Sequence, residues 1–168
     1  SVPSAKAGCA MEKKTIDSLL AEHEFFKGLG EADLTLIAGC GSNVRFDPGQ
    51  YLAREGDPAD RFYAVRHGTV ALEMFVPHRG ATTIQTVSEG ELVGWSWLFP
   101  PYHWQFSARA VDLVRATSFD GTCLRRKCDN NPALGYELMQ RLAQMISHRL
   151  AATRLQLLDV YGPTPTNR

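Results

Sequence analysis

The sequence predicts a mainly β domain with flanking helices and a long C-terminal helix, and three patterns support this. From Val44 onward apolar and polar residues alternate, and glycines divide the chain into short runs rich in Val, Leu, Tyr, Phe and Thr. That spacing is typical of a β-sandwich or barrel with tight turns. Before this segment apolar residues recur at helical spacing, and after Asn131 nothing breaks the helical pattern until Gly162-Pro163.

These changes of period set the expected boundaries along the chain. We expect one helix over Thr15–His23 and a second over Glu31–Ala38. A short helix at Leu124–Lys127 should separate the last strand from the long helix. The expected units are a disordered lead-in at 1–12, one domain at 13–161 and a tail at 162–168, and the domain divides into N-terminal helices at 13–42, β-structure at 43–120 and C-terminal helices at 121–161.

The long helix begins at a clear signal, with Asn131 as cap and Pro132 at the first helical position. About 29 residues would span roughly 43 Å, which is more than a small barrel can cover. Residues on one face recur about every 3.5 residues, the period of a two-helix seam. The seam consists of Met139, Leu142, Ile146, Leu150, Thr153, Leu157 and Val160. We favour a parallel homodimer through this helix, because packing on its own barrel alone would leave Leu150, Leu157 and Val160 exposed.

Charge and hydropathy argue against two classes of partner. The chain has 18 Lys and Arg residues against 18 Asp and Glu residues, so no overall field draws it to nucleic acid or to an acidic membrane. No run approaches the roughly 18 consecutive apolar residues of a membrane-spanning helix. The chain also ends soon after the long helix, too early for a helix-turn-helix, so we expect no nucleic-acid binding by this chain itself.

The cysteines show no metal-site pattern. Cys9, Cys40, Cys123 and Cys128 are scattered, and the last two have no second pair to complete a tetrahedral site. We expect free thiols in a reducing cytosol and therefore a cytoplasmic protein.

One stretch, residues 90–110, contains all three tryptophans and has the features of a binding site. Gly94 ends a strand-like run, one short turn follows over Trp95–Phe99, and Pro100-Pro101 stops it before a strand at Phe106–Val111. A glycine that opens a short helix beside a sheet leaves unpaired N–H groups, which suit an anion or a ligand oxygen. The candidate ligand-binding residues are Gly94, Trp95, Ser96, Trp97, Leu98, His103, Trp104, Gln105, Ser107 and Arg109.

Two motifs carry a resemblance to a known family. Residues 55–70, EGDPADRFYAVRHGTV, match the pattern G-D-x-A-D-x-F-Y-x-V-x-x-G-x-V almost residue for residue, and Phe46-x-Pro48-Gly49 matches the turn before it. From about Phe25 to about Tyr161 the chain resembles the cyclic-nucleotide-binding domain, as in the sensor half of Crp/Fnr (catabolite activator) regulators. The resemblance implies a β-roll over 43–120, a jelly-roll-like double-stranded β-helix. It also implies a non-catalytic regulatory or sensory module that signals through its last helix.

Residues 90–110 are similar to the family's phosphate-binding cassette but lack its two ligand-holding residues. Trp95 stands where the family has the Glu that accepts from the ribose hydroxyl. The family's phosphate-binding Arg falls at Trp104, or at His103 or Gln105 if the loop gap shifts. Each lost charge-assisted hydrogen bond weakens binding by about 1.5 to 3 kcal/mol, so we expect no high-affinity binding of cAMP or cGMP.

Several alternatives stay open. The tryptophan rings either line a pocket for a planar or apolar ligand or fill the vacated nucleotide pocket themselves. The chain could also be a genuine cyclic-nucleotide sensor or effector domain of a Crp/Fnr-type regulator, truncated before its DNA-binding domain. A remote alternative is a cupin-like metal enzyme, but such a site needs His-x-His with a nearby Glu, and the candidates are isolated. These candidates are His67, His78, His103, Glu73 and Glu91. We therefore expect no catalytic residue, no metal site and no cofactor.

Overall fold

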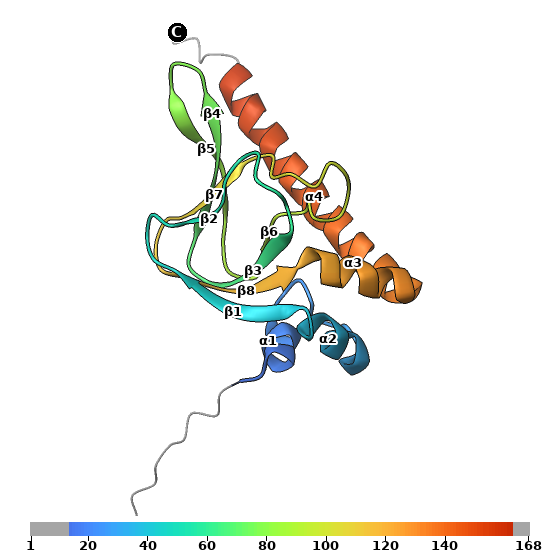
Figure 1. The fold of residues 1–168 in the computed structure, drawn as a ribbon. Coiled ribbons are helices and arrows are strands. Elements are labelled where there is room, and N and C mark those ends of the chain that lie inside the picture. Colours follow the sequence, from blue (N-terminus) through green and yellow to red (C-terminus); the bar gives the residue numbers. More distant parts are fainter. Residues whose placement is uncertain (1–13, 163–168) are drawn as a thin grey trace, which may run out of the picture.

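In the computed structural model, which describes residues 14–162, eight strands form two four-stranded antiparallel sheets (Figure 1). The strands are β1 (Gly41–Phe46), β2 (Tyr51–Ala53), β3 (Arg61–His67), β4 (Val70–Val76), β5 (Gly80–Val87), β6 (Leu92–Val93), β7 (Ser107–Ala110) and β8 (Val114–Asp120). The helices are α1 (Ile16–Glu22), α2 (Glu31–Ala38), α3 (Gly121–Asn130) and α4 (Pro132–Tyr161). The expected lead-in at 1–12 and the tail from 163 onward lie outside the described residues.

Strand order shows that the chain is rolled up. One sheet has the order β1-β8-β3-β6 and the other has the order β2-β7-β4-β5. The first and last strands are therefore neighbours, with Gly41 opposite Phe119 and Phe46 opposite Val114. This closure, with the two sheets facing one another, confirms the expected β-roll.

The two sheets enclose an apolar core. Its members are buried side chains from both sheets and from the segment before β7, as the alternation of the sequence predicts. They include Leu52, Tyr63, Val65, Val70, Leu72, Val87, Val93, Trp104, Phe106, Ala108, Val114 and Ala116.

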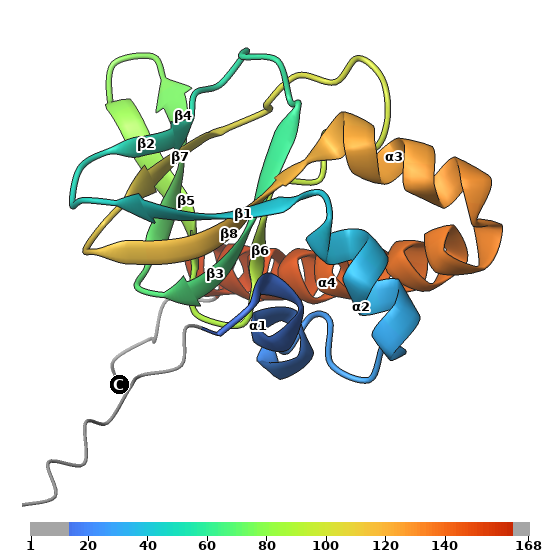
Figure 2. The same cartoon turned by 60° about the horizontal axis from the view of Figure 1, so that its bottom comes forward.

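A second apolar core joins the roll to the helices. Phe62 lies between two parallel rings, with its centroid 4.6 Å from Trp97 and 4.9 Å from Phe119. Around this stack pack buried side chains of the helices, namely Leu20, Phe26, Leu34, Ile37, Leu124, Leu134, Leu138 and Leu142. Figure 2 shows α1, α2 and α3 gathered at one end of the roll, with α4 running along its side.

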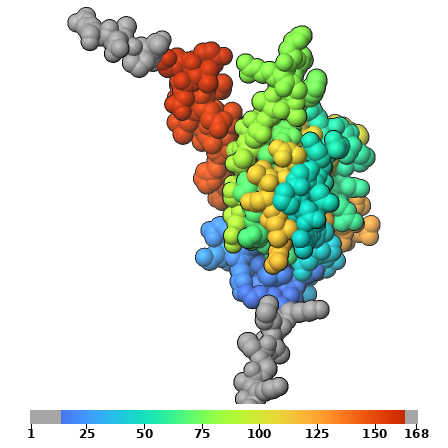
Figure 3. All heavy atoms as spheres, turned by 90° about the vertical axis from the view of Figure 1, so that its left-hand side faces the viewer, coloured from blue at the N-terminus to red at the C-terminus, as the bar shows by residue number. Residues whose placement is uncertain are grey.

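Helix α4 begins where the sequence predicts, because the Asn131 side chain accepts a hydrogen bond from the Leu134 N–H at 3.2 Å and Pro132 occupies the first turn. Its 30 residues span about 45 Å. From Leu150 onward every described residue of the helix is exposed. Figure 3 shows this distal part and the β4–β5 hairpin rising from the body as two separate projections.

Helix α3 is longer than expected, because it begins directly at the end of β8. The Asp120 side chain caps it by accepting a hydrogen bond from the Cys123 N–H at 2.9 Å. None of the described helices is long and apolar enough to cross a membrane.

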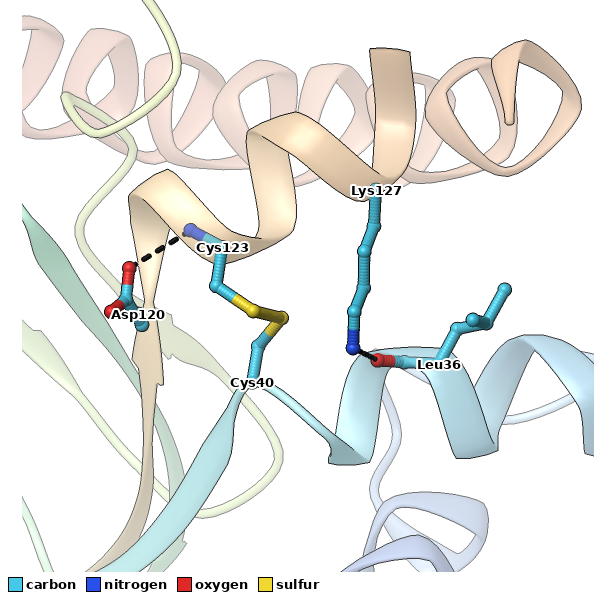
Figure 4. Close-up of a disulfide and its surroundings, with 5 residues drawn as sticks. All are labelled: Leu36, Cys40, Asp120, Cys123 and Lys127. Atoms are coloured by element: carbon cyan, nitrogen blue, oxygen red, sulfur yellow. Dashed lines mark hydrogen bonds between the residues drawn. A yellow bond between two sulfur atoms is a disulfide. The ribbon is translucent and has the colours of Figure 1, made fainter. Parts of the chain in front are cut away.

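The expectation that the cysteines are free thiols is wrong for one pair, because Cys40 and Cys123 form a disulfide (Figure 4). Their Cα atoms lie 5.8 Å apart, although 83 positions separate them in the sequence. The pairing of β1 with β8 explains the contact: Cys40 immediately precedes β1, and its carbonyl accepts a hydrogen bond from the Asp120 N–H at the end of β8. Cys128 is a free, half-buried thiol, and Cys9 lies outside the described residues.

Replacing both linked cysteines, Cys40→Ser with Cys123→Ser, should lower the free energy of unfolding by roughly 2 to 4 kcal/mol, because the disulfide restricts the unfolded chain. Denaturant titration of the oxidised protein and of the double variant measures the difference. Cys128→Ser is the matched control and should have little effect, since that thiol is unpaired. Equal stability of the oxidised protein and the double variant would contradict this prediction.

Candidate ligand-binding site

The site predicted at residues 90–110 begins where β6 ends at Gly94, which has a φ of +97°. A side chain there would be strained, and a Cβ would also overlap the Trp104 indole. The following residues make single turns, closed by hydrogen bonds from the Leu98 N–H to the Trp95 carbonyl and from the Tyr102 N–H to the Phe99 carbonyl. No helix forms here, so the expected row of free N–H groups at a helix start does not exist.

Residues 102–106, here called the cassette limb, lead from these turns back to β7. They pair with residues 55–60, the start of the 55–70 motif. The Trp104 N–H donates to the Asp57 carbonyl at 2.8 Å, and the Trp104 carbonyl accepts from the Gly56 N–H at 2.7 Å. The Ala59 N–H donates to the Tyr102 carbonyl at 2.7 Å. These bonds fix which side chains of the limb face inward. The family-like motif therefore sets the orientation of the cassette limb.

Trp104 fills the interior of the roll beside Gly94. Its side chain is only 4% exposed and belongs to the core between the two sheets. Its ring meets Phe106 edge to face, with centroids 5.9 Å apart. The neighbouring His103 and Gln105 point to solvent. Of the three positions considered for the missing arginine, only position 104 faces the interior, and an indole occupies that space.

Trp95 forms a contact with helix α4 that sequence reasoning missed. The half-buried Trp95 ring lies edge to face with Phe106 at 5.6 Å, and the Arg149 guanidinium lies over it at 5.2 Å. Arg149 also donates a hydrogen bond to the carbonyl of Leu92 in β6. A helix residue therefore contacts both the strand before the cassette and the first aromatic residue inside it.

Arg149 is unusual because its charge is buried. The residue is 6% exposed, and its Nε and Nη1 atoms have no hydrogen-bond partner. Burial lowers the pKa of the guanidinium, and the charge of Glu91 opposes this. The sequence offered only a weak signal for this contact, because an arginine on a helix is usually exposed.

Trp97 belongs to the other core. It is 2% exposed, stacks on Phe62, and its carbonyl accepts a hydrogen bond from Arg125. The half-buried Leu98 packs against the same cluster, and Ser96 between the tryptophans is buried. Trp95 and Trp104 therefore belong to the roll, while Trp97 anchors the cassette to the helices.

Ser107 and Arg109 on β7 have partners within the protein. The Ser107 hydroxyl accepts a hydrogen bond from the Glu55 N–H at 3.0 Å. Arg109 donates from Nε and Nη2 to the carboxylate of the buried Glu73, with both distances 2.7 Å. The hydrogen bond to Glu73, together with its charge, raises the pKa of Arg109. Arg109 is therefore already engaged by a carboxylate of its own fold.

Two hollows lie beside the cassette turns and α4, outside the roll. One of about 420 Å³ is lined by residues of the cassette turn, α3 and α4, including Trp97, Arg125 and Met139. Another of about 390 Å³ lies along α4 beside Glu91 and Arg149. No group of three His, Cys, Asp or Glu side chains suited to a metal ion occurs among residues 14–162. The histidines considered for a cupin-like centre are all exposed, namely His67, His78 and His103.

Comparison with known proteins agrees with this architecture. The family model described as cyclic nucleotide-binding domain matches residues 43–131, more than half of the chain. A structure from Geobacter metallireducens GS-15, whose name proposes a cyclic nucleotide-binding protein, is 31% identical with a TM-score of 0.73, covering 82% of this chain and 99% of that one. The sensor domain of the transcriptional regulator DNR from Pseudomonas aeruginosa has a TM-score of 0.65 at 22% identity, covering 80% of this chain and 91% of that one.

A curated relative extends the comparison to whole regulators. The CRP-like cAMP-activated global transcriptional regulator of Mycobacterium tuberculosis is 26% identical over 145 residues. The match covers 86% of this chain but only 63% of that regulator. These findings confirm the family resemblance that the sequence motifs indicate.

If Trp104 is a core residue, Trp104→Ala should lower the free energy of unfolding by roughly 3 to 5 kcal/mol, the usual cost of emptying a buried aromatic site. His103→Ala is the matched control, because the neighbouring side chain is exposed and should change stability little. Thermal and denaturant unfolding of the three proteins measure both effects. If Trp104→Ala left the free energy of unfolding unchanged, Trp104 would not be a core residue.

Proposed function

This chain belongs to the cyclic nucleotide-binding domain family, and from this premise we propose that it is a non-catalytic regulatory module with a degenerate cassette. Its roll would not hold cAMP or cGMP with high affinity. The observation that carries the proposal is the position of Trp104, whose buried indole occupies the space at the interior arginine position.

Charge arguments support the same conclusion. A cyclic phosphate needs a cation to bind it. Arg109 is the one arginine within residues 90–110, and it is paired with Glu73. Separating that pair would leave a buried carboxylate without a partner, which costs several kcal/mol. A nucleotide would therefore have to displace an indole and break an ion pair before it gained any contact.

We propose that α4 is the output element. Arg149 joins α4 to the Leu92 carbonyl and to Trp95. A change in the conformation of the cassette would therefore change the position of α4 against the roll. The buried and incompletely paired guanidinium makes this contact sensitive, because a small displacement changes which groups compensate its charge. A ligand acting here would need different affinities for two seatings of the helix.

A second candidate function rests on the mycobacterial relative, whose name describes it as cAMP-activated. This chain would then be the cyclic-nucleotide sensor domain of a longer Crp/Fnr-type transcription regulator that acts in the cytoplasm. The chain spans about 63% of the length of that relative. Nucleotide affinity discriminates between the two candidates.

Titration calorimetry with cAMP and cGMP should show binding weaker by about 10² to 10⁴ than in a domain that retains both charged contacts, because two charge-assisted hydrogen bonds are missing. Micromolar or tighter binding of either nucleotide would overturn the degenerate cassette and favour the second candidate.

We also propose a parallel homodimer through α4. The helix continues beyond its own roll with exposed apolar side chains, including Leu150 at 49%, Leu157 at 51% and Val160 at 75% exposure. Met139 is also exposed, and Ile146 is half-buried. Leu142 is different, because it is 3% exposed within its own domain and cannot serve the seam.

Ile146→Glu together with Leu150→Glu should give a folded monomer, because buried charges oppose apolar packing between helices. Sedimentation at tens of micromolar measures the mass. Gln144→Glu with Ala151→Glu is the matched control, since it adds the same charge on the opposite face of α4 and should leave the dimer intact. A monomeric unmutated protein would refute the seam.

A further inference from the structure

We propose that the Cys40–Cys123 disulfide is a modification site for reversible thiol–disulfide exchange, which sets how tightly α3 is held against the N-terminal helices. The reagent class is a small dithiol or glutathione in its reduced and oxidised forms. This inference does not depend on whether the cassette binds a ligand.

The disulfide lies at a junction between two parts of the fold. Cys40 follows the end of α2, and Cys123 lies in the first turn of α3 (Figure 4). One turn further along α3, the Lys127 ammonium donates to the Leu36 carbonyl of α2 at 2.6 Å. The two side chains of α3 reach the same segment, as Figure 4 shows. Cys123 forms a covalent link, which redox chemistry can open. Lys127 forms a hydrogen bond, which redox chemistry does not open.

The two linked cysteines differ in exposure. Cys40 is 8% exposed, while Cys123 is half-buried, so a reagent approaches from the Cys123 side. A thiolate on Cys123 would lie in the first turn of a helix, where backbone N–H groups favour negative charge. The Asp120 carboxylate opposes this charge, but it caps the backbone N–H of Cys123 while the sulfur points away toward Cys40 (Figure 4). Lys127 adds positive charge one turn along the helix.

Reduction then follows two balanced steps. A reagent thiolate attacks Cys123 Sγ and forms a new S–S bond, and the Cys40–Cys123 bond breaks with its electron pair on Cys40 Sγ, which takes a proton. A second reagent thiolate attacks the reagent sulfur of this mixed disulfide, releasing Cys123 as a thiolate and the reagent as a disulfide. The protein gains two electrons and the reagent loses two. Oxidised glutathione drives the reverse sequence, with the Cys123 thiolate as the attacking group.

The reduced form keeps enough contacts to remain folded. The Lys127 hydrogen bond persists, and the apolar cluster of Ile37, Phe119 and Leu124 still joins α2, β8 and α3. Only Asn131 separates α3 from α4. Opening the disulfide therefore removes the covalent hold on α3, which directly precedes α4, while leaving the core in place.

Cys128 provides an internal comparison on the same helix. It is half-buried and unpaired, and burial together with the charge of Asp129 raises the pKa of its thiol. A raised pKa disfavours the thiolate that exchange requires.

The test uses a Cys9→Ser, Cys128→Ser background, which leaves only the linked pair. The oxidised protein is treated with dithiothreitol without denaturant, alkylated and weighed by mass spectrometry, and a second sample is returned to oxidised glutathione first. We expect no label before reduction, a label on each of the two cysteines after it, and loss of both labels on reoxidation. Hydrogen exchange in α3 and at the start of α4 should become at least about tenfold faster on reduction, with the β-roll unchanged.

Adding Cys40→Ser and Cys123→Ser gives the control that lacks the pair. This control should show the hydrogen-exchange pattern of the reduced protein, and dithiothreitol should not change that pattern. Labelling before any reductant, labelling only in denaturant, or loss of protection throughout the roll on reduction would each overturn the proposal.

Discussion

The antiparallel pairing of β1 with β8 is the constraint on which the rest of the structure depends. It joins the first strand to the last, so the ends of the β-segment leave the roll at one place. The helices before and after the roll are therefore forced together, and they bury Phe62, Phe119 and Leu124 in a shared core. The same pairing places Cys40 beside Cys123. Without it the long helix would have no fixed base.

A second constraint acts inside the roll. The loop at residues 55–60 holds the cassette limb by main-chain hydrogen bonds, which do not depend on side-chain identity. This explains how a chain can keep the architecture of a nucleotide-binding domain while an aromatic residue stands at the interior position of the cassette. The fold is maintained by the backbone pairing and the apolar core.

Much of the fold could be predicted from the sequence because its signals are local. Asn131 and Pro132 mark the start of α4, and the alternation after Val44 marks the strands. The site was predicted only in part. Gly94 and Trp104 were singled out, but their mutual contact depends on how residues 56–57 pair with the cassette, which no local pattern encodes.

Contacts between distant residues were missed for the same reason. The spacing of the cysteines could not predict the Cys40–Cys123 disulfide, because 83 positions separate the two residues and only the strand order brings them together. Arg149 was not among the predicted site residues. Its role depends on the cassette lying against α4, a tertiary contact that helical periodicity does not contain.

The fit between Gly94 and Trp104 also limits how this site can change over successive generations. A larger residue at position 94 meets the indole, and a smaller or charged residue at position 104 leaves an unfilled apolar space. Neither position can be altered freely while the other stays as it is. Placing a charged residue at position 104 would therefore require a compensating substitution nearby, with a less stable protein as the intermediate. The close contact between Gly94 and Trp104 therefore favours keeping both residues together.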